Sequence, residues 1–94
     1  MSKGKRTEER VAVELPVHVG DATGTTRDIS ATGMFFELDA SHTLGTTVDL
    51  TVEMDTPGGK MLLKCHGNVI RVIPHGDKVG VAVKMTEMTM EPVQ

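Results

Sequence analysis

The sequence contains no tryptophan and no tyrosine, and its only aromatic side chains are Phe35 and Phe36. The core of this 94-residue chain is therefore expected to be aliphatic, built from valine, leucine, isoleucine and methionine. Small barrels that bind single-stranded nucleic acid use exposed aromatic rings as stacking platforms. Because neighbouring residues of a strand point to opposite faces, at most one of the two phenylalanines is available for stacking, which argues against that function.

Cysteine and long apolar segments are also scarce. Cys65 is the only cysteine, which excludes an intramolecular disulfide and a zinc site built from several cysteines. It is expected to be a small buried hydrophobic residue. No apolar run is long enough to span a bilayer, and residues 1–11 are polar rather than typical of a signal peptide, so a cytoplasmic location is expected.

The sequence lacks the motifs of common enzyme classes. It has no Gly-x-Ser-x-Gly elbow, no phosphate-binding loop and no glycine-rich dinucleotide fingerprint. The four histidines include no i, i+4 pair that would hold a metal, and each is expected to be a solvated polar residue: His18, His42, His66 and His75. The chain is therefore predicted not to be an enzyme, with no catalytic residues and no metal site.

Charge is distributed unevenly along the chain. Residues 1–10 carry four basic and two acidic side chains, a net charge of +2, and their lack of apolar periodicity predicts a flexible arm. Residues 11–94 carry six basic and eleven acidic side chains, a net charge of −5. An acidic body argues against a general nucleic-acid-binding protein, which usually presents a broad basic face. A short basic arm on an acidic body instead fits a small anionic ligand.

Alternating apolar residues predict six short strands, separated by turns rich in glycine, proline and aspartate. Pro16 lies on the outward face of the first strand, which favours an edge or a bulge at that position. The six predicted strands cover residues 11–19, 25–30, 33–38, 48–54, 60–73 and 79–83.

This pattern predicts an all-β fold, an antiparallel barrel or sandwich. Within residues 60–73 the apolar phase changes after Val69, so Gly67 and Asn68 are expected to form a bulge or bend. A strand that bends to serve two sheets favours a closed barrel. Residues 85–94 are expected to form a helix of at most two turns, since Met85 and Met88 lie three apart.

The first candidate binding motif lies at the end of the second predicted strand. Asp28 and Ser30 are two residues apart, so their side chains share a face, and Ile29 points to the other. Residues 31–33 form a tight connection, in which Gly33 is expected to supply a backbone conformation or a close approach that a Cβ atom would hinder. The result is a polar face that ends at a glycine and is suited to hold a ligand.

The second candidate motif is a pair of arginines, Arg6 and Arg10, directly before the first predicted strand. Arginine recognises phosphate and the O6/N7 edge of guanine through two parallel hydrogen bonds. A carboxylate such as Asp28 has the complementary ability, because it accepts hydrogen bonds from the N1–H and N2 amino donors of guanine. The arm and the Asp-Ser pair together form a chemically coherent receptor for a phosphorylated guanine.

The combination Arg6-x-x-x-Arg10 with Asp28-x-Ser30-x-x-Gly33 resembles the PilZ domain, the bacterial receptor module for cyclic di-GMP. Residues 11–19 look like the first strand of that family, and residues 67–72 and 79–83 look like its later strands. The resemblance implies a six-stranded antiparallel PilZ-type β-barrel over residues 11–94. It also implies a flexible N-terminal arm over residues 1–10 and a short C-terminal helix.

The resemblance implies a role for each motif residue. Arg6 and Arg10 would bind the phosphates and the guanine Hoogsteen edges of cyclic di-GMP. Asp28 and Ser30 would hold a guanine from the barrel surface, and Gly33 would shape the turn.

Three further basic residues are assessed by the same comparison. Lys5 matches a position that is often basic in the family, and would add positive charge against the two phosphates of the ligand. Arg27 is rated below Lys5, because its strand phase points it away from Asp28. Arg71 stands where an aromatic residue is common, and offers a cation–π contact in its place.

The expected function is that of a cyclic di-GMP sensor that orders its arm on binding and signals to a partner protein. It is expected to act as a monomer or ligand-dependent dimer, without another cofactor, a nucleic acid polymer or insertion into a membrane. The alternative is a PilZ-like adaptor that recognises a partner protein without nucleotide. The presence of both Arg6 and Arg10 argues against this alternative, since degenerate members of the family typically lose the arginines.

Overall fold

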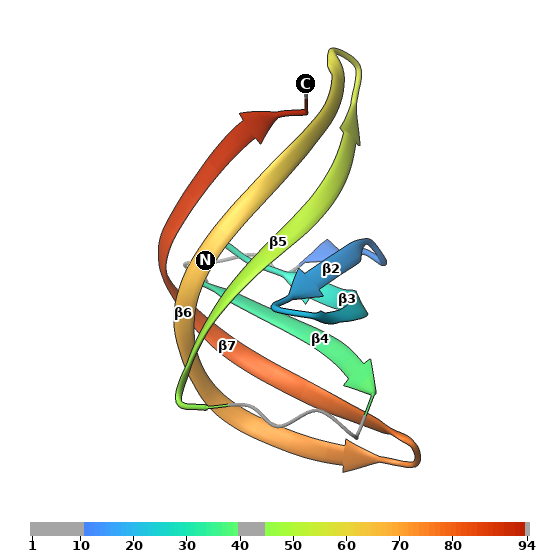
Figure 1. The fold of residues 1–94 in the computed structure, drawn as a ribbon, viewed down its shortest axis with the longest axis vertical. Helices are drawn as coiled ribbons and strands as arrows, with labels where there is room; N and C mark the ends of the chain where they lie inside the picture. Colours follow the sequence, from blue (N-terminus) through green and yellow to red (C-terminus); the bar gives the residue numbers. More distant parts are fainter. Residues whose placement is uncertain (1–10, 40–44, 94) are drawn as a thin grey trace, which may run out of the picture.

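The computed structural model describes residues 11–39 and 45–93, which form one antiparallel sheet that closes into a barrel (Figure 1). The order in the sheet is β1-β3-β2-β5-β6-β7-β4, and pairing of β3 with β4 closes the ring. Six strands, β2 to β7, make the barrel, which confirms the predicted six-stranded antiparallel fold. The strands are β1 Val11–Ala12, β2 Pro16–Val19, β3 Ala22–Ile29, β4 Gly33–Asp39, β5 Thr47–Thr56, β6 Gly59–His75 and β7 Lys78–Pro92.

The first predicted strand, residues 11–19, is divided into β1 and β2 opposite Thr26. The buried Thr26 hydroxyl donates a hydrogen bond to the Val13 carbonyl oxygen at 2.6 Å and accepts one from the Leu15 amide at 2.9 Å. These bonds satisfy backbone groups that the interrupted ladder leaves unpaired. β2 then begins at Pro16, whose missing amide donor suits the first residue of a strand.

The barrel interior is aliphatic apart from Phe36, and alternate residues of β4, β5 and β7 fill it. Phe36 is fully buried in this core, whereas Phe35 lies on the outer face. The ring of Phe35 covers Gly80, where an added Cβ atom would lie 2.6 Å from Phe35 Cζ. Gly80 therefore provides the space that seats this ring on the barrel surface.

β6 is the longest strand, and it bends at Gly67 as predicted. Its pairing with β7 shifts register at Gly67 and again just beyond Val69, which leaves Ile70 out of the β7 ladder. An added Cβ atom on Gly67 would lie 2.4 Å from the Lys84 carbonyl oxygen, so this close approach of the two strands requires glycine. The second shift turns the Ile70 side chain outward, where it is 65% exposed.

The prediction of a helix over residues 85–94 is wrong, because β7 continues as a strand to Pro92. Gln94 lies outside the described residues. From Met85 onward, β7 pairs with the first half of β6, back to Met61. The spacing of two methionines favoured a helix, but the β6–β7 ladder supplies backbone hydrogen bonds along the whole segment. Tertiary pairing therefore outweighs a weak local propensity.

Cys65 is buried in the barrel, as predicted, and burial raises the pKa of its thiol from an ordinary 9.0 to about 11. At pH 8 the thiolate fraction of such a group is only about 0.1%. We expect Ellman's reagent to modify Cys65 at least about 100-fold more slowly in the folded protein than in urea. Rapid modification at pH 8 without denaturant would contradict this burial.

Candidate ligand-binding site

Asp28 lies on the outer face of the barrel near the end of β3. It pairs with Phe35 of β4 and with Ala12 of β1, and its side chain is half-buried. The register of β3 against β4 shifts between the buried Thr26 and Asp28, and this bulge turns Asp28 to the outer face while its neighbour Ile29 packs against the core.

Cross-strand pairing places Asp28 in a row that runs across four strands of this outer face. Phe35 of β4 is followed by Ala82 of β7 and then by Arg71 of β6. Since neighbouring strands lie about 4.8 Å apart, the backbone of Arg71 is about 14 Å from that of Asp28 along the sheet. A carboxylate and a guanidinium therefore mark the two ends of a row whose middle is apolar.

Ser30 follows β3 and holds the turn into β4. Its amide donates a hydrogen bond to the Gly33 carbonyl oxygen at 2.8 Å, and its hydroxyl oxygen accepts one from the Gly33 amide at 3.1 Å. The Ser30 hydroxyl also donates a hydrogen bond to the Gly33 carbonyl oxygen, at 3.3 Å. This network closes the turn locally and keeps the buried Ser30 side chain at the end of the Asp28 face.

The reason expected for a glycine at position 33 is not the one that the structure supports. The glycines with positive φ in the described residues are Gly20, Gly59 and Gly76, so Gly33 needs no left-handed conformation. An added Cβ atom would meet the Val83 carbonyl oxygen at 3.4 Å, which is an ordinary contact distance. The surface that adjoins Gly33 is left open by the absence of a side chain at this position.

A cavity of about 200 Å³ adjoins this turn. Of its lining residues, the sequence analysis proposed only Ser30 and Gly33 for the site, and Ile70 and Lys84 are among those that it missed. Lys84 pairs with Gly33 and with Asn68, so its exposed ammonium group lies on the same outer face. The change of apolar phase after Val69 was the sequence signal for Ile70. The proximity of Ile70 to Ser30 depends on the register shift between Val69 and Arg71. The cavity is lined by Ser30, Thr32, Gly33, Met34, Ile70, Ala82, Val83 and Lys84.

The arginine motif, Arg6 and Arg10, and Lys5 lie outside the described residues. The described chain nevertheless begins beside the second motif. β1 starts at Val11, directly after Arg10, and its second residue Ala12 pairs with Asp28. The expectation that strand phase points Arg27 away from Asp28 is wrong, because the bulge after Thr26 leaves both side chains on the outer face. The Arg27 guanidinium forms an ion pair with Glu37 at 3.8 Å.

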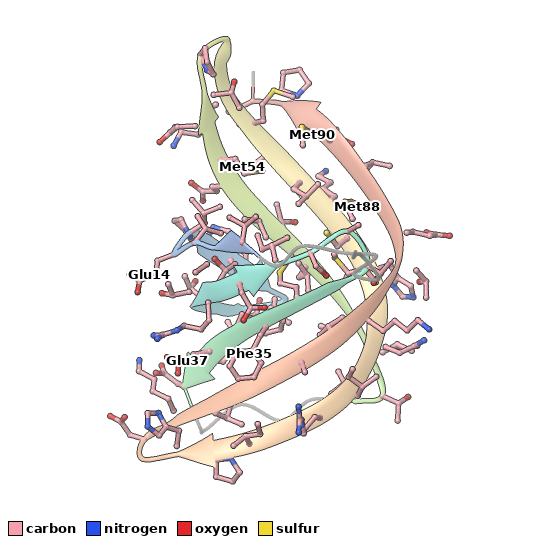
Figure 2. The ribbon with its side chains drawn as sticks, turned by 180° about the vertical axis from the view of Figure 1, so that it is seen from behind. Glu14, Phe35, Glu37, Met54, Met88 and Met90 are labelled. Carbon is pink, nitrogen blue, oxygen red and sulfur yellow. The ribbon has the colours of Figure 1, made fainter. Side chains whose placement is uncertain are left out.

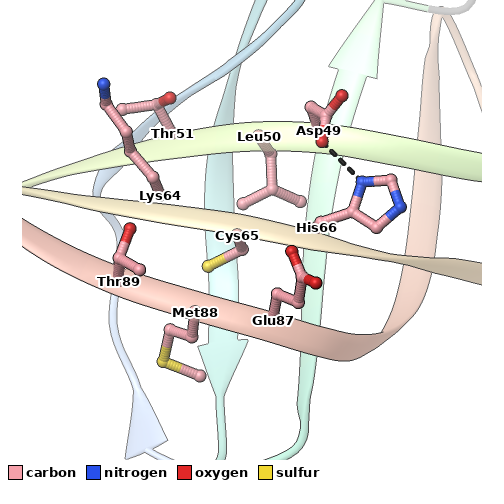
Figure 3. A pocket seen from close by; sticks show the side chains of 9 residues that line it. All are labelled: Asp49, Leu50, Thr51, Lys64, Cys65, His66, Glu87, Met88 and Thr89. Carbon is pink, nitrogen blue, oxygen red and sulfur yellow. Dashed lines mark hydrogen bonds and ion pairs between the residues drawn. The ribbon is translucent and has the colours of Figure 1, made fainter.

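A second cavity, of about 350 Å³, spans β5, β6 and β7, and Figure 3 shows the residues that line it. His66 Nδ1 lies 2.5 Å from Asp49 Oδ1, and Cys65 is the adjacent residue on β6. His66 and Cys65 point to opposite faces of the strand, and burial keeps the Cys65 thiol protonated by raising its pKa. The cavity therefore contains no histidine-activated thiolate.

The histidines of the described segments lie near carboxylates, and His75 is also largely exposed to solvent. His18 Nε2 lies 2.5 Å from Glu53, and His75 Nδ1 lies 3.8 Å from Glu37. His42 lies outside the described residues. Among the residues that the structure describes, no three histidine, cysteine or carboxylate side chains come together as a metal site.

The PilZ domain family matches residues 3–94 of this sequence, a segment that contains both candidate motifs. The chain belongs to the PilZ family. PilZ domains are binding and adaptor modules known as receptors for cyclic di-GMP, so the resemblance drawn from Arg6, Arg10, Asp28, Ser30 and Gly33 is confirmed at the level of the family.

The fold of this PilZ domain is similar to that of the inhibitor of motility MotI/DgrA from Bacillus subtilis, with a TM-score of 0.78 and 15% sequence identity. The match covers 92% of this chain and 44% of that protein, so the PilZ domain spans less than half of its length. At this identity the likeness shows the fold alone. A comparison with curated proteins found no match.

The part of this PilZ domain that the structure describes includes no helix with the length and apolar character needed to cross a membrane.

Proposed function

We propose that this PilZ domain is a cyclic di-GMP sensor that binds the nucleotide on its outer face and signals to a partner protein. The observation that carries the proposal is the convergence of Asp28, the Ser30–Gly33 turn and Lys84 on one side of the barrel. β1, which follows the arginine motif, runs beside this surface. A carboxylate for guanine and cations for phosphate therefore belong to neighbouring parts of the chain.

Each group has a chemical task in this proposal. The Asp28 carboxylate accepts hydrogen bonds from the N1–H and N2 amino groups of guanine. The Ser30 hydroxyl oxygen accepts one bond from the Gly33 amide, and its second lone pair takes a guanine amino hydrogen. Ile70 and Phe35 offer apolar surface to the base, while Lys84 adds a point charge for a phosphate.

The arginines supply the other half of the site in this mechanism. Arg6 and Arg10 bind the phosphates and the Hoogsteen edges of guanine, with Lys5 adding positive charge. Ordering the arm costs roughly 1–2 kcal/mol for each residue whose backbone is fixed. Several charge-assisted hydrogen bonds, at about 1.5–3 kcal/mol each, offset that cost. The ordered arm changes the surface that a partner protein encounters.

Isothermal titration calorimetry of the full chain with cyclic di-GMP tests the proposal. We expect a dissociation constant below about 10 µM, equivalent to about −7 kcal/mol. Cyclic di-AMP is the matched control, because adenine presents an acceptor at N1 where Asp28 needs a donor. Failure to bind cyclic di-GMP at about 100 µM would reject the sensor and favour the nucleotide-independent adaptor.

A further inference from the structure

Most lysines and arginines of the barrel are engaged by carboxylates. The described residues include six of them, and four lie within 4.0 Å of an aspartate or glutamate oxygen: Arg27, Lys60, Lys64 and Lys78. Within residues 11–39 and 45–93, the exposed side chains of Arg71 and Lys84 have no such partner, although residues 11–94 carry a net charge of −5. We call Arg71 and Lys84 the cation pair.

The two members of the cation pair lie on the same outer face, on neighbouring strands. Arg71 of β6 pairs with Ala82 of β7, and Lys84 is two residues beyond Ala82. Val81 and Val83 are buried on either side of Ala82, so Ala82 and its partners face outward. Such diagonal positions lie about 7–8 Å apart, which two long side chains can bridge. Both side chains can therefore contact the same anion.

The surface beside the cation pair is open. Lys84 pairs with Gly33, which has no side chain, and Arg71 pairs with Ala82, which has a short one. The cavity of about 200 Å³ lies here, with Lys84, Ala82 and the turn residue Ser30 in its lining. An anion that enters this cavity therefore meets positive charge without displacing a large side chain.

Glu37, a carboxylate on the same outer face, does not neutralise the cation pair. It lies on β4, two residues beyond Phe35, and Figure 2 labels both side chains. Its carboxylate contacts Arg27 at 3.8 Å and His75 at 3.8 Å. The positive charge of the cation pair therefore remains available to a ligand.

We propose that Arg71 and Lys84 form a phosphate subsite on the sheet itself, and that this subsite holds one phosphate of cyclic di-GMP. The guanidinium fork of Arg71 suits two oxygens of one phosphate, and the ammonium group of Lys84 adds a point charge. The row Asp28–Phe35–Ala82–Arg71 places the carboxylate for guanine at one end and the subsite at the other. The identity of the nucleotide rests on the proposed function, whereas anion binding by the cation pair does not.

Phosphate binding accounts for Arg71 better than stacking on a base does. The sequence comparison offers a cation–π contact at this position, and such a contact needs a single cation. Arg71 instead has a second cation, Lys84, as its diagonal neighbour. Two like charges repel each other, and an anion between them turns this repulsion into two attractions.

The cation pair differs from the arginine motif in the entropy that is lost on binding. Arg71 and Lys84 lie in paired strands, so they lose only side-chain freedom when they hold a phosphate. In the proposed mechanism, Arg6 and Arg10 contribute only after the backbone of the arm is ordered. The sheet is therefore expected to hold a phosphate without the two arginines of the motif.

Calorimetric titration of the full chain with cyclic di-GMP compares two double variants. Arg71→Gln/Lys84→Gln should weaken binding at least about ten-fold, through the loss of charge-assisted hydrogen bonds. Lys64→Gln/Lys78→Gln removes the same charge from the same two strands, but from lysines that already pair with carboxylates. Its affinity should stay within about three-fold of the wild type. An equal loss in both variants, or no loss in the first, would overturn the subsite and leave the sensor standing.

A second titration separates the subsite from the proposed function. Inorganic pyrophosphate replaces the nucleotide, and the side-chain N–H signal of Arg71 is followed in the ¹⁵N-labelled full chain. We expect this signal to shift in the wild type and in Arg6→Ala/Arg10→Ala, and to require more pyrophosphate in Lys84→Gln. This result in a wild type that does not bind cyclic di-GMP would support the subsite and reject only the sensor. No shift in the wild type, or its loss in Arg6→Ala/Arg10→Ala, would overturn the subsite.

Discussion

Replacing Asp28 by alanine is expected to weaken cyclic di-GMP binding by roughly 10- to 100-fold, because hydrogen bonds to a charged acceptor contribute about 1.5–3 kcal/mol. Asp28→Asn should be no better, since the amide of asparagine places donors against the amino group of guanine. Arg10→Ala should cause a similar loss through its phosphate contact. Calorimetric titration of each variant measures the change.

Arg27→Ala is the matched control for these variants. Arg27 is adjacent to Asp28 and carries the same charge as Arg10, but its guanidinium pairs with Glu37. An exposed pair at this distance contributes at most about 1 kcal/mol, so stability should change little. Its affinity for cyclic di-GMP should remain within about three-fold of the wild type. A loss as large as that of Asp28→Ala, or an unchanged Asp28→Ala, would show that the face around Asp28 is not the binding surface.

Gly24→Ala is expected to destabilise the fold by about 3 kcal/mol, or to prevent folding, through overpacking. Gly24 lies in β3, where an added Cβ atom would be 2.0 Å from the Glu37 carbonyl oxygen and 2.7 Å from Leu38 Cδ2. The Leu38 side chain can rotate away, but the backbone oxygen belongs to β4 and to the ladder that closes the barrel. Relief therefore requires the β3–β4 closure to open.

Urea denaturation measures the free energy of unfolding of Gly24→Ala. In a domain of this size the melting temperature should fall by at least about 10 °C. Gly58→Ala is the control, because its nearest non-neighbouring atom would lie 3.9 Å from the new Cβ. Equal stability of the two variants would contradict the close approach of β3 to β4.

Much of this fold follows from local patterns in the sequence. Alternation predicts where most strands lie, since a half-buried strand must place apolar side chains on one face. The Gly67 bend and the burial of Cys65 follow for the same reason: each is visible as a glycine or an apolar residue in a strand pattern. The spacing of Arg6 and Arg10 with Asp28, Ser30 and Gly33 indicates the PilZ family before any coordinates are considered.

The extent of β7 and the surroundings of Gly33 are decided by contacts between distant segments. Residues after Met85 have a composition that permits a short helix, and only their pairing with the first half of β6 makes them a strand. Gly33 resembles a turn glycine with unusual dihedrals, yet its φ is not positive, and it lines a cavity together with Val83 of another strand. In both cases the contacting strand lies far away in the sequence, so local patterns do not reveal it.

The sequence by itself thus determined the barrel, its aliphatic core and the two motifs, because these depend on periodicity and residue type. Only the tertiary structure decided that Phe35, Ala82 and Arg71 share a row with Asp28, and that Ile70 and Lys84 adjoin the Ser30 turn. The same holds for the diagonal positions of Arg71 and Lys84. Register sets these neighbours, and a shift of one residue would turn each side chain to the opposite face.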